Sequence, residues 1–301
     1  MEGVTALDTV AERLQHGEAL RDEDAALVLG SHDLVSIGML ADDVRRQMHG
    51  AETTFVRVFE MHVDAVPPLL PAGVAAGELR IVGTPASLEA ARSAVEAARR
   101  LASTAPLFGF SLHDIAALGR FDSIIPVLVK AGLDGIAEVA IDREPSPGAV
   151  EQARASGLLV LRATVHAPPR ELLPMITGAR DFLRQSTGFR TFAPLPRQLS
   201  ISSPTSGYDD VKAVALARLM LREVPSVQVD WPLYGPKLAQ VGLIVGADDV
   251  DGVLAVDGGV LGARRSPLEE IRGNIRAAGL VAVERDGRFN RRESAPGRTD
   301  G

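Results

Sequence analysis

The chain has 301 residues, of which 46% are hydrophobic, and it carries a formal net charge of −7 with no cysteine. Without cysteine, disulfides, thiolate zinc sites, cysteine nucleophiles and cysteine-ligated iron–sulfur clusters are all excluded. The negative balance gives no electrostatic reason to bind nucleic acid, so we expect a small-molecule or protein partner. No apolar run approaches a bilayer span of roughly 18–20 residues, and no basic, apolar leader follows Met1, which predicts a soluble cytoplasmic protein without a membrane partner.

Residues 1–50 are predicted to form an N-terminal helical extension. Residues 7–14 and 22–29 are short amphipathic stretches, and Asp33 is placed to cap an apolar run at helical spacing that follows it.

From residue 51 to residue 260 the pattern predicts a β/α barrel. Short apolar segments predict strands at 53–59, 78–82, 107–111, 136–141, 158–164, 190–195 and 227–231. Helical segments between them are expected at 87–102, 121–131, 147–156, 168–185 and 209–223. This alternation suits a parallel barrel of the TIM type better than an open sheet, because no GxGxxG or GxxxxGKS motif follows the first strand.

Two regions depart from this pattern. Residues 66–77 (VPPLLPAGVAAG) are rich in Pro and Gly where the first crossover helix is expected, so we predict a barrel that is distorted or incomplete there. Residues 261–290 are predicted to be a C-terminal helical segment, followed by a disordered tail at 291–301.

The densest group of carboxylates is Asp248, Asp249 and Asp251, within the segment 246–252 (GADDVDG). Such a group coordinates a divalent cation or binds sugar hydroxyls in some proteins, and in others it is a plain turn. The segment lacks the later ligands of an EF-hand, and no two histidines are three to five residues apart. We therefore predict no metal site and keep the three aspartates as candidates for ligand binding.

Several other residues are placed where barrel enzymes bind their ligands, at the carboxyl ends of strands. His113, Asp114 and Glu138 are candidates for acid–base chemistry, with outward-facing surface residues as the alternative. His166, Trp231 and Tyr234 are candidates for ligand binding, and the aromatic pair equally suits the closed end of a core. We expect four of these side chains to gather around one cavity: His113, Glu138, His166 and Trp231.

Two further predictions concern the residues after the second strand and three basic residues of the C-terminal half. Gly83 and Thr84, which follow the second strand, are candidates for cofactor binding, because glycine allows a ligand to approach the backbone, although a tight turn explains the pair equally well. Arg218, Arg222 and Lys237 are interpreted as solvated helix faces.

Several segments together resemble aminofutalosine synthase, the radical-SAM enzyme of the futalosine route to menaquinone. They are 188–195 (GFRTFAPL), 215–221 (ALARLML), 237–240 (KLAQ), 246–252 (GADDVDG), 275–279 (IRAAG) and 283–286 (VERD). The resemblance covers roughly residues 20–290 and implies a radical-SAM barrel, S-adenosylmethionine over a [4Fe–4S] cluster, and a chorismate-derived substrate. The family's CxxxCxxC motif after the first strand is absent here, where residues 59–64 (FEMHVD) lead into the Pro/Gly loop.

The losses fall where the family holds its cluster and S-adenosylmethionine, so radical chemistry has no source of electrons in this chain. The first hypothesis is a degenerate relative without the [4Fe–4S] cluster, which binds a pathway metabolite or pairs with a catalytically intact synthase paralogue. We expect no cofactor, with S-adenosylmethionine binding as the alternative. The second is a repurposed enzyme that acts on a futalosine-like or chorismate-derived molecule without radicals. A third is a structural remnant without a ligand.

Overall fold

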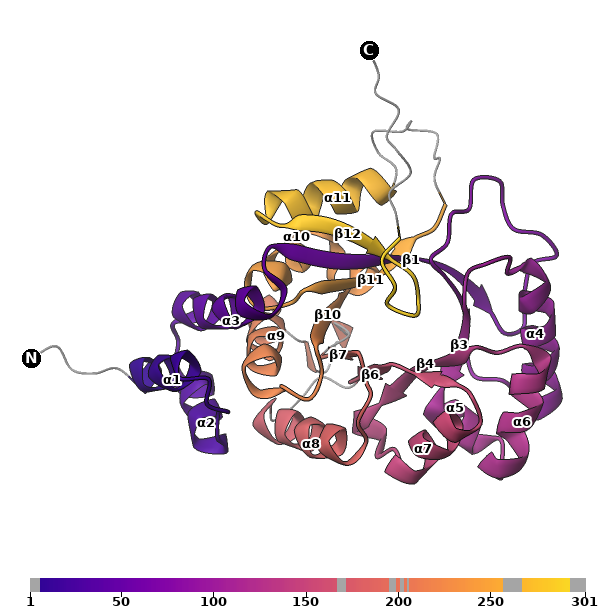
Figure 1. The fold of residues 1–301 in the computed structure, drawn as a ribbon, viewed down its shortest axis with the longest axis horizontal. Coiled ribbons are helices and arrows are strands. Elements are labelled where there is room, and N and C mark those ends of the chain that lie inside the picture. The colour runs from indigo at the N-terminus through magenta and orange to yellow at the C-terminus, as the bar shows by residue number, and fades with distance from the viewer. Residues whose placement is uncertain are drawn as a thin grey trace, which may run out of the picture.

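A computed structural model describes residues 6–166, 172–194, 199–200, 203–204, 206–256 and 267–292 of the chain (Figure 1). Its central feature is a parallel β-sheet that closes into a barrel. The strands are β1 (Glu52–His62), β2 (Glu78–Val82), β3 (Leu107–Ser111), β4 (Gly135–Ala140), β5 (Leu159–Val160), β6 (Arg162–Thr164), β7 (Thr191–Ala193), β10 (Ser226–Asp230) and β11 (Asp249–Leu254). A separate two-stranded hairpin consists of β8 (Leu199–Ser200) and β9 (Ser203–Pro204).

The barrel closes because β1 pairs with β2 on one edge and with β11 on the other. Within the described residues this gives eight strand positions, since β5 and β6 are two pieces of one position, interrupted at Leu161. The described helices around it are α4 (Leu88–Leu101), α5 (Leu112–Ala117), α6 (Phe121–Ala131), a 3₁₀ turn at Ile141–Arg143, α7 (Pro147–Ala155), α8 (Leu172–Gln185), α9 (Gly207–Met220), α10 (Trp231–Ile244) and α11 (Pro267–Ala277). The predicted β/α barrel is confirmed.

The connection from β1 to β2 contains no helix, as the Pro/Gly composition of residues 66–77 predicts. This segment is held by backbone hydrogen bonds from Ala75 to Ala255 and from Gly77 to Arg57. The barrel stays closed here nonetheless, because β1 and β2 pair from Val58 to His62. The distortion is a missing crossover helix, and the sheet itself has no gap at this point.

A ninth strand position, β12 (Val281–Arg285), adds to the sheet outside the barrel order. It pairs with residues 52–56 of β1, whereas β2 pairs with residues 58–62 and β11 with residues 54–58. The residues of β1 that pair with β11 include some that also pair with β12 and some that also pair with β2. Strand β11 therefore occupies one edge of β1, and β12 and β2 share the other edge. The amino-terminal half of that edge is therefore occupied by β12, beside α11 in Figure 1.

The predicted C-terminal helical segment at 261–290 is only partly right, because the helix α11 is followed by the strand β12. The predicted tail at 291–301 also begins too early. Arg291 pairs with Arg285 in an isolated bridge, and the backbone N–H of Arg292 donates to Glu284. Residues 293–301 lie outside the described part of the chain.

The N-terminal extension consists of α1 (Ala6–Gln15), α2 (Asp22–Gly30) and α3 (Leu34–His49), which lie to one side of the barrel in Figure 1. Helix α3 packs on α9 through its apolar face, which includes Ile37 and Ala41, and Asp33 caps it as predicted. Helix α1 contacts α2 and α3 and makes no comparable contact with the barrel. None of the described helices combines the length and apolar character needed to cross a bilayer.

Candidate functional site

The interior of the barrel is filled by a network of buried charges. Arg80 of β2 donates two hydrogen bonds of 2.9 Å to Asp251 of β11 and one of 2.6 Å to Glu78. Arg162 of β6 lies 3.0 Å from the same Asp251 and donates to Gln228 of β10. These arginines and the nearby Arg285 hold the pKa of Asp251 well below its usual range against the effect of burial, so its carboxylate stays charged.

A second layer of the network lies closer to the amino-terminal ends of the strands. Arg285 of β12 donates two hydrogen bonds of 2.6 Å to Asp249, and Gln228 donates another of 2.6 Å. Thr54 also donates to Asp249, so this fully buried carboxylate is saturated with donors. Asp249 and Asp251 alternate with apolar residues on β11, which places both on the interior face.

The turn after β12 closes the amino-terminal mouth of the barrel. The Phe289 ring lies 3.8 Å from the Arg285 guanidinium carbon, and Phe289 has a left-handed φ of 66°. Gly287 lies against Glu78 and Phe108, where a Cβ would come within 2.7 Å of the Glu78 carboxylate. Figure 1 shows this turn, in yellow, reaching from β12 toward the barrel centre.

Asp248 lies outside the barrel network and links the residues before β11 to helices α9 and α3. Its carboxylate accepts a hydrogen bond from Arg218 of α9 and one of 2.8 Å from the backbone N–H of Val227. His49 lies 3.4 Å from the same carboxylate. Arg218 is only 1% exposed, so its interpretation as a solvated helix residue is wrong, whereas Arg222 is exposed as expected.

Residues 249–252 of the segment 246–252 therefore belong to strand β11, and only Gly246 lies in a turn. Its last glycine, Gly252, has a φ of 72° and lies at a β-bulge, where the register of β1 on β11 shifts between Phe55 and Arg57. A Cβ on Gly252 would lie 2.8 Å from Pro232. The turn-like composition thus reflects the bulge, and all three aspartates already have arginine partners.

A cavity of about 200 Å³ remains at the carboxyl ends of the strands. Its polar lining comes from several strands and from α5: Glu60, Arg80, Ser111, Asp114, Glu138, Arg162 and Asp230. Burial raises the pKa of Asp230, and the nearby Asp251 adds to this effect while Arg162 opposes it. Phe110, which also lines the cavity, has a left-handed φ of 60°, a conformation that costs a non-glycine residue about 1–3 kcal/mol.

Glu138 lines this cavity and forms a hydrogen-bonded pair with His166, which lies outside the lining, with Glu138 Oε1 2.8 Å from His166 Nε2. Thr164 donates to the other carboxylate oxygen at 3.0 Å, and Asp142 accepts from the His166 backbone N–H. The hydrogen bond to Glu138 raises the pKa of His166. Although burial opposes it, the hydrogen bond from His166 together with Arg162 lowers the pKa of Glu138. A positive imidazolium beside a negative carboxylate is the favoured state.

Gly83, Thr84 and Asp114 lie together at the rim of the same cavity. Thr84 donates a hydrogen bond of 2.8 Å to Asp114, which also caps α5. Gly83 has a φ of 92°, and a Cβ there would lie 2.6 Å from Nε2 of His62. The neighbouring His113 is exposed on α5 and does not line the cavity, contrary to the expected gathering.

Trp231 and Tyr234 are also absent from the cavity lining. Both belong to the first turns of α10, which begins directly after β10, where Asp230 caps it through the Leu233 backbone N–H. Their rings are buried in the core, and burial raises the pKa of the Tyr234 hydroxyl. The structure thus brings together Glu138 and His166 of the four residues expected to meet, and it places Trp231 in the packing of the core.

The sequence analysis missed the three arginines that organise the site, Arg80, Arg162 and Arg285. Each stands in an otherwise apolar or β-rich strand: ELRIV, LLVLRAT and VAVER. A long cation in such a strand needs a carboxylate partner when it is buried, and the 246–252 segment supplies those partners.

The residues present do not fit a cysteine-ligated cluster. No cysteine exists in the sequence, and the side chains of His62, at the end of β1, and Asp64, just after it, are more than half exposed. Across the described ranges, no three His, Asp or Glu side chains converge to hold a metal ion. The cavity is also smaller than the about 300–1,000 Å³ usual for drug-sized ligands.

Comparison with known proteins agrees with this architecture. Residues 189–296 match the model of the CofH/MqnC C-terminal region. The chain is similar to aminodeoxyfutalosine synthase of Thermus thermophilus, with 24% identity over 92% of this chain and 93% of that protein. It is also similar to 5-amino-6-(D-ribitylamino)uracil–L-tyrosine 4-hydroxyphenyl transferase of Archaeoglobus fulgidus, with 39% identity over 29% of this chain and 27% of that protein.

Solved structures show the same fold at low identity. Methylornithine synthase (PylB) superposes with a TM-score of 0.60 and 12% identity, covering 91% of this chain and 97% of that one. The [FeFe]-hydrogenase maturase HydG gives a TM-score of 0.62 at 14% identity, covering 93% of this chain and 75% of that one. The chain has no cysteine, is similar to the aminodeoxyfutalosine synthases over most of its length, and matches the CofH/MqnC C-terminal region over residues 189–296.

Proposed function

We propose that this chain is a cytoplasmic, non-radical binding protein of the futalosine route to menaquinone. It holds a small polar metabolite, the size of a nucleoside or a chorismate-derived acid, in the cavity at the carboxyl ends of the strands. The observation that carries this proposal is a polar cavity of about 200 Å³ lined by Glu138, whose carboxylate is hydrogen-bonded to His166, in a chain without cysteine. Active and binding sites of β/α barrels lie at this face.

The surrounding charges support binding by hydrogen bonds. Arg80 and Arg162 are occupied by Asp251 and other acceptors, so they line the cavity as fixed, neutralised groups. Glu138 offers an acceptor in the cavity lining, and His166 holds this carboxylate from outside the lining. The strained Phe110 is consistent with a ligand site, because backbone strain concentrates at such sites.

Differential scanning fluorimetry with S-adenosylmethionine, adenosine, futalosine and chorismate derivatives tests the proposal. One of the smaller compounds is expected to raise the melting temperature, whereas S-adenosylmethionine leaves it unchanged. Glu138→Gln should abolish the shift, and Glu144→Gln, at an exposed residue in the connection that follows β4, should not. No shift with any compound would favour the structural remnant.

The Glu138–His166 pair also favours a second candidate, a repurposed enzyme that transfers protons without a cofactor. His166 as imidazolium is a proton donor and Glu138 a proton acceptor at hydrogen-bond distance. Incubation with futalosine-like and chorismate-derived compounds, followed by mass spectrometry, separates the two functions. Product formation that is lost in His166→Gln supports the enzyme, and binding without turnover supports the binding protein.

The protein partner that we propose is a catalytically intact synthase paralogue. Co-purification of the two chains from cells that express both at native levels tests this pairing. An accessory role requires a complex that survives gel filtration or changes the turnover of the intact enzyme.

A further inference from the structure

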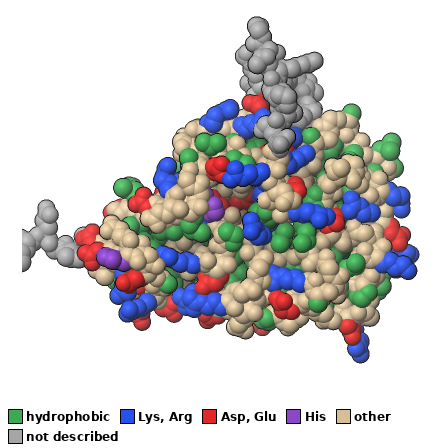
Figure 2. Space-filling model, viewed as in Figure 1, with side chains coloured by type: hydrophobic (Ala, Val, Ile, Leu, Met, Phe, Trp, Pro, Cys, Tyr) green, Lys and Arg blue, Asp and Glu red, His purple; other side chains and the backbone are tan. Residues whose placement is uncertain are grey.

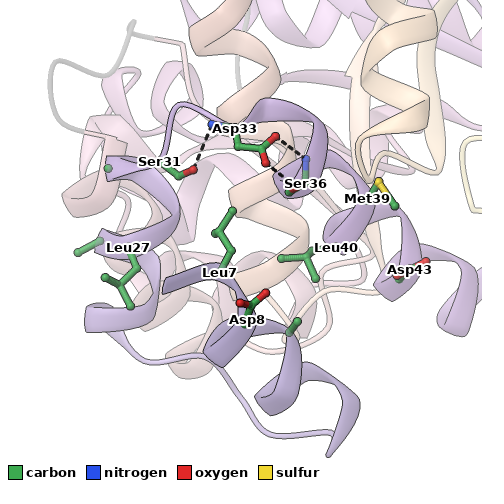
Figure 3. A pocket seen from close by; sticks show the side chains of 12 residues that line it. Leu7, Asp8, Leu27, Ser31, Asp33, Ser36, Met39, Leu40 and Asp43 are labelled. Carbon is green, nitrogen blue, oxygen red and sulfur yellow. Dashed lines mark hydrogen bonds between the residues drawn. The ribbon is translucent and has the colours of Figure 1, made fainter. Parts of the chain in front are cut away.

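The N-terminal helices enclose an apolar groove that the barrel chemistry does not use. It has a volume of about 870 Å³ and lies between α1, α2 and α3, away from the strand ends. Figure 3 shows Leu7, Leu27 and Leu40, one from each helix, lining the groove, with Met39 and Asp43 along its α3 side. The groove is open to solvent along one side and is large for three short helices.

The apolar lining is exposed in the isolated chain. Leu27 is 41% and Met39 is 63% exposed. Ser36, Met39, Leu40 and Asp43 follow each other at helical spacing on α3, so they present one continuous face to the groove. The apolar part of the lining is shared by the three helices, with Leu7, Leu27 and Met39 among its members, and such an exposed apolar surface marks an interaction site more often than a single exposed side chain does.

The net charge of this region is negative. Residues 1–50 contain ten acidic and four basic side chains, a balance of −6 against −7 for the whole chain. Asp8, Asp33 and Asp43 line the groove, and no Lys or Arg does. Arg13 and Arg45 are bound to carboxylates of the extension itself. Elsewhere, over the face drawn in Figure 2, acidic and basic side chains are interspersed.

We propose that this groove binds an amphipathic helix of a partner protein, with an apolar stripe flanked by Lys and Arg. An open apolar trough between helices suits a helix, whose side chains at every third or fourth position fill it. The acidic rim provides the electrostatic complement to basic flanks. It repels anionic membranes and nucleic acid, and it opposes a second copy of this chain, since each copy brings the same excess of negative charge. The proposal is independent of the ligand in the barrel.

Fluorescence anisotropy with a labelled synthetic helix of leucine and lysine tests this proposal on the full chain. The peptide is expected to bind, and a leucine–glutamate helix and a scrambled leucine–lysine peptide are expected not to bind. Met39→Arg should weaken binding about tenfold or more. Val35→Arg is the matched control, because Val35 lies on the same helix, is 73% exposed and does not line the groove. Its affinity should stay within about twofold of wild type.

A second variant separates charge from apolar contact. Asp43→Lys leaves the apolar lining intact and should weaken binding at low salt while reducing its salt dependence. Equal binding of both leucine helices, or wild-type affinity in Met39→Arg, would overturn the proposal. So would concentration-dependent dimerisation that Met39→Arg abolishes, which identifies a second copy as the occupant. Binding that appears only after deletion of residues 2–5 would identify the chain's own amino terminus instead.

Discussion

Glu138 Oε1 lies 2.8 Å from His166 Nε2, and this pair joins β4 to the residue two positions past β6. Both partners lie on the face where barrel proteins bind ligands, and both have shifted pKa values. The direction of each shift makes the contribution of this pair to stability depend on pH.

The pair should stabilise the fold most between about pH 4.5 and 6.5, the ordinary pKa values of the two groups. The pKa of His166 is raised on folding, so its contribution is complete below 6.5 and is lost as pH rises through the folded-state value. The pKa of Glu138 is lowered, so its contribution is present above 4.5 and is lost as pH falls through the folded-state value. Urea unfolding of wild type and Glu138→Gln across this range measures the difference.

His166→Gln should reproduce the same pH profile, and Glu144→Gln should show a difference that does not vary with pH. NMR titration gives an independent measurement. In Glu138→Gln the pKa of His166 should fall, because burial then acts without its main opposing contact. A His166 pKa that does not respond to the loss of Glu138 would show that the pair is not formed.

Anaerobic reconstitution with iron and sulfide should give a colourless protein. A [4Fe–4S] cluster needs thiolate ligands, and the sequence contains none. Absorption and EPR spectra measure the outcome, and an aminofutalosine synthase with its cysteines, treated in parallel, shows that the procedure works. A stoichiometric, EPR-active cluster in this chain would contradict the prediction.

Phe289 combines a ring that covers Arg285 with a left-handed backbone. Phe289→Ala should destabilise the protein by about 1–2 kcal/mol, because it removes a cation–π contact and apolar burial while the unfavourable φ remains. Phe289→Gly removes the same ring and relieves the backbone, so it should be more stable than Phe289→Ala by about 1 kcal/mol.

Chemical denaturation of the two variants gives this order. Ala116→Gly, at an exposed position of α5, is the control in which the order reverses, with glycine less stable by about 0.5–1 kcal/mol. If Phe289→Gly is no more stable than Phe289→Ala, the backbone of Phe289 is not left-handed in the turn that closes the barrel.

Much of the barrel was predictable because each strand–helix unit is locally encoded. The apolar segment at 78–82 and the amphipathic segment at 87–102 became β2 and α4 almost residue for residue. The absence of a first crossover helix was equally local, since Pro and Gly disfavour a helix at 66–77 whatever surrounds them.

The site was harder to predict because it depends on pairs distant in sequence. The sequence around Asp249 is typical of a turn. Its structural role follows only from the fold, which places Arg285 and Gln228 within hydrogen-bond distance of its carboxylate. Arg218 looks solvated because α9 is flanked by polar residues in sequence, yet that helix is covered on nearly all sides and Arg218 is buried against Asp248. Strand β12 was not predicted because its position depends on a free edge of β1. That edge is free because β2, which begins at Glu78, pairs with β1 only from Val58 onward.

Substitution of an aspartate of β11 distinguishes a structural role from a ligand-binding role for the segment 246–252. Asp249→Asn should lower the free energy of unfolding by about 3–5 kcal/mol, because it leaves Arg285 buried without its counter-charge. Asp181→Asn is the matched control, since the Asp181 side chain is 62% exposed, and it should change stability by about 0.5 kcal/mol or less. Urea unfolding without ligand measures both. An Asp249→Asn variant as stable as wild type that has lost a ligand-induced melting shift would instead make Asp249 a ligand contact.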